Sequence, residues 1–143
     1  MKPAEVRYYI DADVLGLAKV LAALRPDVTY PGDPGATIHK RTRAACPITK
    51  VHTDDDEWIP VVAENGWLVI TRDARISTST REIAIVKEHG ARLVAIAGKE
   101  GKSTWPQLEI VLANWRRIEG LLNLPGPFIY TATRTALAKQ PLD

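Results

Sequence analysis

The sequence predicts an α/β fold, in which helices cover both faces of a sheet of parallel strands. Short apolar runs of strand character alternate along the chain with segments of helical periodicity. The run WLVIT at residues 67–71 is aromatic, aliphatic or β-branched throughout, which is typical of a strand buried on both faces. This run and an earlier one lead into acids, Asp73 and Asp11. We therefore expect right-handed βαβ connections that bring both acids to one edge of the sheet.

The composition is that of an ordinary globular chain of 143 residues, for which we expect a single domain over residues 1–143. A hydrophobic share of 45% and a charged share of 25% are typical of water-soluble proteins, and the net charge of +2 permits a nucleic-acid partner. Cys46 is the single cysteine, which excludes an intramolecular disulfide and an all-cysteine metal site. The first residues lack a signal-peptide pattern, and no apolar run approaches the roughly 20 residues of a membrane span. We expect a cytoplasmic protein that does not enter a membrane.

The first third of the chain predicts two strands around one helix. Residues 6–11 have the pattern of a strand, and the helical pattern that begins at Asp13 ends before Pro26. Residues 27–30 fit a short second strand. The following residues 31–53 contain PGDPG and show little apolar periodicity, so we expect a connection without regular structure. A connection of this length inside a compact domain is usually functional or mobile.

The middle of the chain predicts a helix over residues 54–65, followed by the buried strand over residues 67–71. The acids in the first turn of this helix suit the positive end of the helix dipole. Pro60 lies several residues inside, which predicts either a kink or a helix that begins near Ile59. Gly66 fits the residue that ends the helix.

The last part of the chain predicts two further pairs of helix and strand. Residues 81–89 form a helix that Gly90 closes, and residues 91–97 form the next strand. Residues 104–123 have the pattern of a long amphipathic helix, and residues 128–133 have that of a last strand before a tail. The order βαβαβαβαβ is typical of a parallel sheet between helices.

Four tryptophans are expected to pack against other side chains: Trp58, Trp67, Trp105 and Trp115. Trp105 and Trp115 lie ten residues apart on the last predicted helix. This spacing predicts that they lie on similar sides of the helix, in the core or on a face that binds a partner.

Acidic residues from several segments should meet at one edge of the sheet, because strands end and helices begin at the same edge of a βαβ unit. Asp11 and Asp73 follow strands, and the acids at predicted helix starts are Asp13, Asp54, Asp55, Asp56, Glu57 and Glu82. Carboxylates brought this close repel one another unless a cation neutralises them. Oxygen ligands suit Mg²⁺ or Mn²⁺, and such ions activate water for attack on a phosphodiester.

Plainer roles compete with metal binding for several of these residues. Asp13 fits a helix N-cap, and the acids at 54–57 fit the helix dipole. Asp11 and Asp73 lie at strand ends, which have no such dipole to satisfy. The hydroxyl of Thr71 either completes its strand or forms a hydrogen bond with an acid or a metal-bound water.

Basic side chains near the same edge or in the segment 31–53 could hold a nucleic-acid backbone. They are Lys40, Arg41, Arg43, Arg72, Arg75 and Arg81. The plainer alternative is that these residues form a solvated surface.

Three parts of the chain resemble PIN-like nucleases, and in particular the branch of VapC-type toxins of bacterial toxin–antitoxin systems. YIDADVLGLAKVL, at residues 9–21, resembles the opening strand, acid and helix of that family. DDEWIPVVAENGWLVITRD, at residues 55–73, resembles its second block, an acid at a helix start and a strand ending in Thr-Arg-Asp. The end, from Trp105 through GPFIY, resembles its closing helix and strand. The likeness leaves out residues 31–53 and implies a three-layer α/β/α domain with a central, mostly parallel sheet.

The resemblance also implies a metal-dependent ribonuclease site. Asp11, Asp55 and Asp73 match the family acids and would be the catalytic residues that hold Mg²⁺ or Mn²⁺. Three neighbouring acids are further candidate ligands: Asp13, Asp56 and Glu82. Because three aspartates follow one another, Asp56 could take the role given to Asp55.

We therefore expect a metal-dependent endoribonuclease, a toxin that hydrolyses RNA phosphodiesters with metal-activated water. The resemblance implies RNA as the substrate and a cognate antitoxin as a protein partner, and it leaves a homodimer open. Two alternatives compete with this function. One is a Mg²⁺-dependent aspartate phosphoacceptor, for which Lys99 would supply the required lysine after a strand. The other is a non-catalytic binding module whose acids only cap helices.

Overall fold

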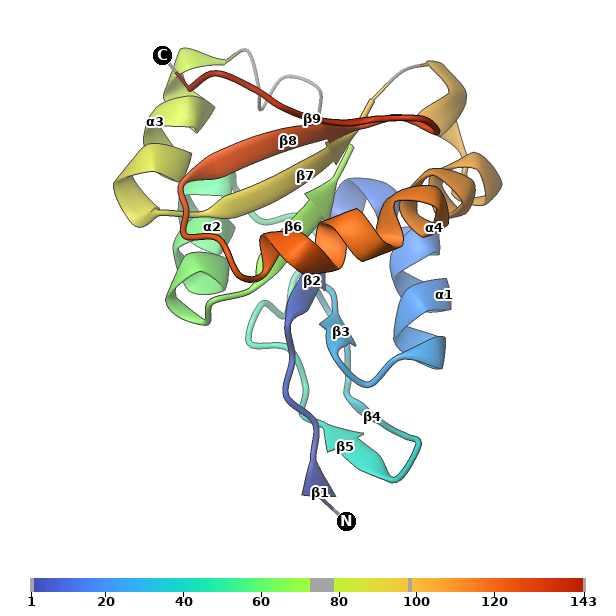
Figure 1. The fold of residues 1–143 in the computed structure, drawn as a ribbon. Helices are drawn as coiled ribbons and strands as arrows, with labels where there is room; N and C mark the ends of the chain where they lie inside the picture. Colours follow the sequence, from blue (N-terminus) through green and yellow to red (C-terminus); the bar gives the residue numbers. More distant parts are fainter. Residues whose placement is uncertain (1, 73–78, 98, 143) are drawn as a thin grey trace.

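The computed structural model describes residues 2–72, 79–97 and 99–142, and its elements form a layered α/β arrangement (Figure 1). The helices are α1 (Leu15–Leu24), α2 (Asp55–Glu64), α3 (Thr80–His89) and α4 (Thr104–Leu121), with 3₁₀ helices η1 (Ala12–Val14) and η3 (Lys99–Lys102). The strands are β1 (Lys2–Pro3), β2 (Tyr8–Ile10), β3 (Val28–Thr29), β4 (Ala36–Ile38), β5 (Arg41–Arg43), β6 (Leu68–Thr71), β7 (Arg92–Ile96), β8 (Phe128–Ala132) and β9 (Leu137–Lys139). None of the helices in these ranges is long and apolar enough to cross a membrane.

The larger sheet has the strand order β3-β2-β6-β7-β8-β9. Its first five strands run parallel, and β9 pairs antiparallel with β8 at one edge. Tyr8 of β2 pairs with Leu68 of β6, which pairs in turn with Arg92 of β7. The predicted α/β fold with a mostly parallel sheet is confirmed. The expected C-terminal tail is wrong in part, because part of it adds β9 to this sheet.

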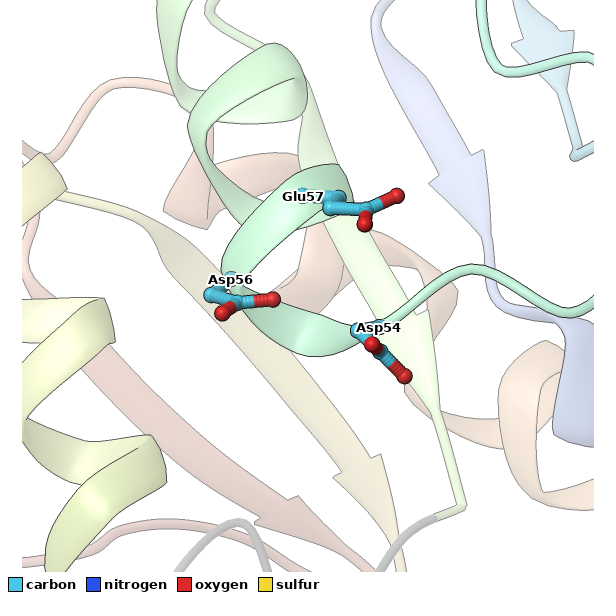
Figure 2. A group of neighbouring side chains, drawn as sticks. All are labelled: Asp54, Asp56 and Glu57. Atoms are coloured by element: carbon cyan, nitrogen blue, oxygen red, sulfur yellow. The ribbon is translucent and has the colours of Figure 1, made fainter.

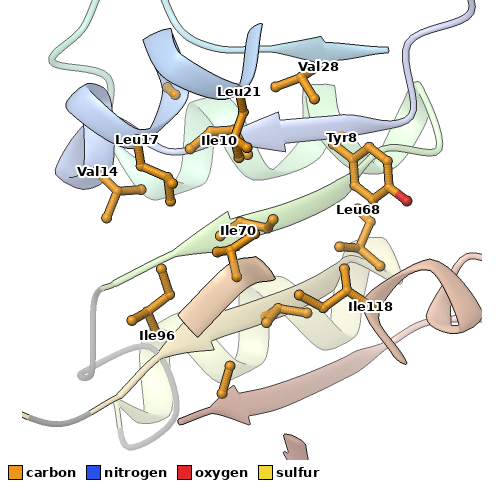
Figure 3. Close-up of a cluster of buried hydrophobic side chains, with 14 of the residues drawn as sticks. Tyr8, Ile10, Val14, Leu17, Leu21, Val28, Leu68, Ile70, Ile96 and Ile118 are labelled. Carbon is orange, nitrogen blue, oxygen red and sulfur yellow. The ribbon is translucent and has the colours of Figure 1, made fainter. Parts of the chain in front are cut away.

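Helices α1 and α4 cover one face of the larger sheet, and α2 and α3 cover the other (Figure 1). On one face, Leu17 of α1 and Ile118 of α4 pack in the same cluster as Tyr8 of β2 (Figure 3). On the other face, Ile59 of α2 and side chains of α3 pack with Tyr9. Successive residues of a strand point to opposite faces, so β2 contributes to both clusters. Every residue of β6 is buried, as the unbroken apolar run predicts.

Helix α2 begins at Asp55 and continues through Pro60. The backbone amide of Trp58 already donates to the carbonyl oxygen of Asp54, so the first turn forms ahead of the proline. The alternative of a helix that begins near Ile59 is therefore wrong. The acids of this turn thus lie at a helix N-terminus, as the predicted helix over residues 54–65 requires.

The other predicted helices and strands are present, with small shifts at their ends. Gly66 and Gly90, which were expected to end α2 and α3, have φ angles of +71° and +66°. These angles lie in the left-handed region, which glycine enters without the steric penalty of a β-carbon.

Residues 31–53 were expected to lack regular structure, and this prediction is wrong. Strands β4 and β5 form an antiparallel hairpin, and β5 pairs in parallel with β1 to give a second sheet in the order β1-β5-β4. The carboxylate of buried Asp33 accepts hydrogen bonds from Arg43 Nε at 2.7 Å and from the Thr29 hydroxyl at 2.9 Å. These strands have three residues each, which is too short for an apolar alternation to mark them in the sequence.

Three of the four tryptophans pack as expected. The rings of Trp58 and Trp67 stack with Tyr9 at centroid distances of 5.6 and 6.2 Å, and Trp115 packs against the other core cluster. Trp105 is 69% exposed, so its predicted packing in the core is wrong, and the alternative of a partner-binding face stays a prediction. Ten residues of helix leave two side chains about 80° apart, which is enough to turn Trp105 away from the core.

Candidate functional site

Asp11 and Thr71 lie at the carboxyl ends of the neighbouring strands β2 and β6. Asp11 continues the pairing of these strands, because its backbone amide donates to the carbonyl oxygen of Ile70 at 2.9 Å. Its side chain then caps η1, where Oδ1 accepts a hydrogen bond from the amide of Ala12 at 2.7 Å. A backbone amide thus holds Oδ1 of Asp11, whereas Oδ2 faces the candidate site.

The hydroxyl of Thr71 lies between two carboxylates. Its Oγ1 is 3.0 Å from Oδ2 of Asp11 and 3.2 Å from Oδ2 of Asp13. The backbone amide of Arg72 donates to Oδ2 of Asp13 at 3.1 Å. Asp13 therefore faces the end of β6 as well as the start of its own helix. Of the two roles weighed for Thr71, hydrogen bonding to an acid is confirmed.

The environment of Asp11 disfavours its ionised form. Burial of the side chain and the nearby charge of Asp13 raise the pKa of Asp11 to about 7, with a smaller contribution from the charge of Asp55. The hydrogen bonds from Ala12 and Thr71 act in the opposite direction. A proton on this carboxylate, or a cation beside it, would therefore stabilise the folded protein.

Among the acids at the start of α2, Asp55 is the one whose charge acts on Asp11. Its Oδ1 accepts a hydrogen bond from the indole Nε1 of Trp58 at 2.9 Å, which holds the side chain against the protein. The other three acids of this turn are exposed and have carboxylate oxygens within 4.8 Å of one another (Figure 2): Asp54, Asp56 and Glu57. The turn therefore presents one inward acid and an outer acidic group.

Two other predicted site residues lie around this edge. Arg81 Nη2 lies 3.3 Å from Oδ2 of Asp56 in an exposed ion pair between α3 and α2. Glu82 is half-buried in the first turn of α3, where its backbone amide lies 3.5 Å from the hydroxyl of the N-cap Ser79. Asp73 and Arg75 lie outside the described residues, and their predicted roles remain predictions.

The predicted basic residues separate into two groups. Arg72 and Arg81 lie at the acidic edge, whereas Lys40 and Arg41 lie on the hairpin of β4 and β5, at the opposite end of the larger sheet (Figure 1). Arg43 is buried, and its Nη1 donates to two backbone carbonyl oxygens in addition to its ion pair with Asp33. The prediction that Arg43 contacts RNA is therefore wrong, because its guanidinium group is buried and forms its hydrogen bonds within the protein.

The sequence of this chain matches a known protein family over the segments that form the site. The model of the family described as "PIN like domain" matches residues 7–98, which is more than half of the chain. This chain belongs to the PIN-like domain family. The matched part of this PIN-like domain contains β2 with Asp11 directly after it, α2 with Asp55, and β6 with Thr71. The predicted resemblance to the family is confirmed.

A curated protein shares sequence with part of this PIN-like domain. It is named "Putative ribonuclease VapC45", from Mycobacterium tuberculosis (strain ATCC 25618 / H37Rv), and is 32% identical over 85 residues. The alignment covers 54% of this chain and 55% of that protein, so the chain spans about half the length of this relative. No solved structure gives a significant match.

The support of Asp55 by Trp58 was not predicted from the sequence. Its signal is the spacing of three residues, which places a side chain of the first helical turn beside one of the next turn. The backbone amide of Arg72 was likewise not predicted as a donor to Asp13, because residue types give no signal for a backbone donor.

Proposed function

We propose that this PIN-like domain is a metal-dependent endoribonuclease and the toxin of a toxin–antitoxin pair. The observation that carries the proposal is the convergence of Asp11 and Asp13 on one hydroxyl, with the charge of Asp55 close enough to act on Asp11. These residues come from three separate elements and meet at the edge where parallel α/β sheets bind ligands. The name of the relative in Mycobacterium tuberculosis supports the choice of RNA as substrate.

The residues present fit a divalent cation. The site offers carboxylate and hydroxyl oxygens, which are the donors that Mg²⁺ and Mn²⁺ prefer. Burial, and after it the charge of Asp13, raises the pKa of Asp11, so a cation beside this carboxylate would favour its ionised form. We assign the ion to Asp11, Asp55 and Asp73, with Asp13 and Glu82 as further candidates, whereas Asp56 is exposed and pairs with Arg81. When bound, such an ion polarises a phosphate oxygen and lowers the pKa of a water molecule.

The chain's own residues would orient this site. Thr71 and the amide of Arg72 hold Asp13 in place, and Trp58 holds Asp55. The cationic side chains of Arg72 and Arg81 are close enough to the same edge to attract the RNA backbone. Neighbouring groups that orient ligand side chains commonly change metal affinity or activity by about 10- to 100-fold when they are removed.

A protein partner follows from the toxin assignment. An antitoxin that covers the acidic edge would block access of RNA to Asp11 and Asp55. The sequence resemblance to VapC-type toxins supports this part of the proposal, and we also propose that the active protein resides in the cytoplasm. The phosphoacceptor and binding-module alternatives have less support, because membership of the PIN-like family favours phosphodiester hydrolysis.

The test is RNA cleavage by purified protein with Mg²⁺, with Mn²⁺ and with a chelator. We expect cleavage only with a divalent ion, and a loss of about 100-fold or more in Asp11→Asn. Glu64→Gln is the matched control, since Glu64 is an exposed acid at the far end of α2. Cleavage that survives in Asp11→Asn, or that needs no metal, would overturn the proposal. Mass measurement after treatment with a small phosphodonor would then test the phosphoacceptor alternative.

A further inference from the structure

A hollow lies at the end of β2 that is opposite to Asp11. It has a volume of about 650 Å³, and the polar side chains of its lining include Arg7, Arg25, Asp27, His39 and Arg41. Arg7 directly precedes β2 and Asp11 directly follows it, which places them about 13 Å apart along the extended strand. Figure 1 shows β1, β4 and β5 projecting from this end, away from the carboxyl ends of β6 and β7.

Positive charge is concentrated around this hollow. Exposed cations come from β1, from the hairpin turn, from β5 and from the residue before β2: Lys2, Lys40, Arg41 and Arg7. Glu5 lies 3.9 Å from one of them, and Arg25 and Asp27 neutralise each other through two contacts of 2.9 Å. The surplus of three positive charges exceeds the net charge of +2 of the whole chain.

Three of these cations have no acidic partner in the ranges that the structure describes: Lys2, Lys40 and Arg41. Together with His39 they also line a second hollow of about 510 Å³. Side chains of this kind are available to an anionic ligand without first breaking an ion pair.

The turn of the hairpin is built from residues that do not favour its backbone conformation. His39 and Lys40 join Ile38 to Arg41 in a two-residue turn, and their φ angles are +49° and +64°. Turns of this type favour asparagine and glycine, because other residues meet a steric penalty at positive φ. Such strained positions occur preferentially at ligand contacts. The backbone of the turn is therefore less stable than it would be with asparagine and glycine, and the turn presents the side chains of His39 and Lys40.

Buried polar contacts anchor the base of the hairpin. Arg43, the last residue of β5, is buried in its ion pair with Asp33 and also binds the carbonyl oxygens of Ala22 and Arg25 at the end of α1. The cations of the turn are therefore presented from a fixed support. Binding to a fixed support loses less conformational entropy than binding to a disordered loop.

The chemistry of this surface matches a nucleic-acid backbone better than a protein. The centre of a protein interface is commonly apolar and rich in aromatic residues. Here half of the described residues that line the hollow are charged, none is aromatic apart from His39, and Leu24 is the large apolar side chain exposed there. Unpaired lysine and arginine side chains are the usual contacts of phosphate groups, which position a nucleic acid without reading its sequence.

We propose that the hairpin turn and the adjoining hollow form a second RNA contact, which binds the phosphodiester backbone at the end of the sheet remote from the carboxylates. The inference rests on the proposed function, which supplies RNA as the ligand. An RNA that spans both ends of β2 is held at two places, so the protein binds long RNA more tightly than short oligonucleotides.

The test compares two double variants that each remove two positive charges. One is Lys40→Gln with Arg41→Gln, and the control is Lys87→Gln with Lys139→Gln, at exposed positions on α3 and β9. Binding of a labelled single-stranded RNA of about 20 nucleotides is measured by fluorescence anisotropy in EDTA over a range of salt concentrations. We expect the hairpin variant to bind about tenfold more weakly, with a salt slope shallower by about 1.4. The control should remain close to the native protein.

Several outcomes overturn the inference. Unchanged RNA binding in the hairpin variant excludes the contact, and an equal loss in both double variants assigns the effect to net charge. Loss of binding to poly-glutamate with unchanged RNA binding assigns the surface to an acidic protein. Metal-dependent cleavage is measured separately on the native protein and on both double variants. If none of them cleaves RNA but binding still depends on the hairpin, the proposed function is wrong and the second RNA contact stands. Matching thermal unfolding of the variants shows that the fold is intact.

Discussion

The hydroxyl of Thr71 lies 3.0 Å from Oδ2 of Asp11, although the two residues are 60 positions apart in the chain. The contact follows from the parallel register of β2 and β6, in which Ile10 pairs with Ile70. Thr71 is fully buried, so its hydroxyl has little freedom to turn elsewhere. One buried side chain thus fixes the positions of Asp11 and Asp13 relative to each other.

Replacement of Thr71 by valine should lower metal-dependent cleavage by about 10- to 100-fold. Valine keeps the shape of the side chain but leaves Asp11 and Asp13 without the shared donor, so the pKa of Asp11 should rise further. The pH at which activity reaches half its maximum should move upward. Thr71→Ser keeps the hydroxyl and serves as the control. If the valine variant keeps native activity and pH profile, the hydroxyl has no role in positioning the acids.

Stability without metal should fall as the pH rises from about 4 to about 7. Over this window the native protein keeps a proton on Asp11, whose pKa is raised from 3.8 to about 7, while the unfolded chain has released it. The ionised form then penalises the native state, by up to about 4 kcal/mol above pH 7. Urea unfolding in EDTA measures this dependence, and the difference between native protein and Asp11→Asn isolates the part due to Asp11. Parallel pH curves for the two proteins would contradict the prediction.

Trp58→Phe should weaken metal binding by about tenfold, because it removes the indole donor that holds Asp55. Phenylalanine keeps a ring against Tyr9, so the loss of stability should stay near 1 kcal/mol. Trp67→Phe is a matched control. Trp67 also stacks on Tyr9, but it directly precedes β6 and so lies at the opposite end of that strand from Thr71. Titration with Mn²⁺ separates the two variants. Equal losses in both would show that ring packing, and not the hydrogen bond to Asp55, matters for the metal.

Loss of one partner from the buried pair of Arg43 and Asp33 should strongly destabilise the protein. Arg43→Met leaves the carboxylate of Asp33 buried without its cation, which costs about 3–5 kcal/mol. The double variant Arg43→Met with Asp33→Asn should recover part of this loss, because it removes the uncompensated charge. Urea unfolding gives the free energies. A loss below about 1 kcal/mol for the single variant would show that the pair is dispensable.

Replacing the turn His39-Lys40 by Asn-Gly should stabilise the hairpin and weaken RNA binding together. Asparagine and glycine accept positive φ more readily, so the free energy of unfolding should rise by about 1 kcal/mol. The same change removes one cation of the proposed second RNA contact. Unfolding and anisotropy measurements on the same variant test both expectations. A variant with lower stability would show that the two native side chains support the turn in some other way.

The sequence by itself determined the layered α/β fold and its principal elements. The run at 67–71 predicts a strand buried on both faces, and every residue of β6 is buried. The glycines after α2 and α3 predict helix ends, and both have positive φ. These features depend on periodicity and local backbone preference, which are properties of neighbouring residues and can be read from the sequence.

Only the tertiary structure decided which charged side chains face the site. Asp55 and Asp56 are adjacent in the sequence, yet Asp55 is held by Trp58 and acts on Asp11, whereas Asp56 pairs with Arg81 in solvent. The rotation of α2 on the sheet fixes this difference, and core packing sets that rotation.

The same limit applies to the basic residues and to the short strands. Arg43 and Arg41 are two residues apart on one strand, but one is buried in an ion pair and the other is exposed. The sequence gives the charge of each residue, whereas its surroundings come from segments far away in the chain. Strands β4, β5 and β9 have three residues each, too few to show a periodic pattern, and their strand structure depends on pairing with residues that local pattern does not reveal.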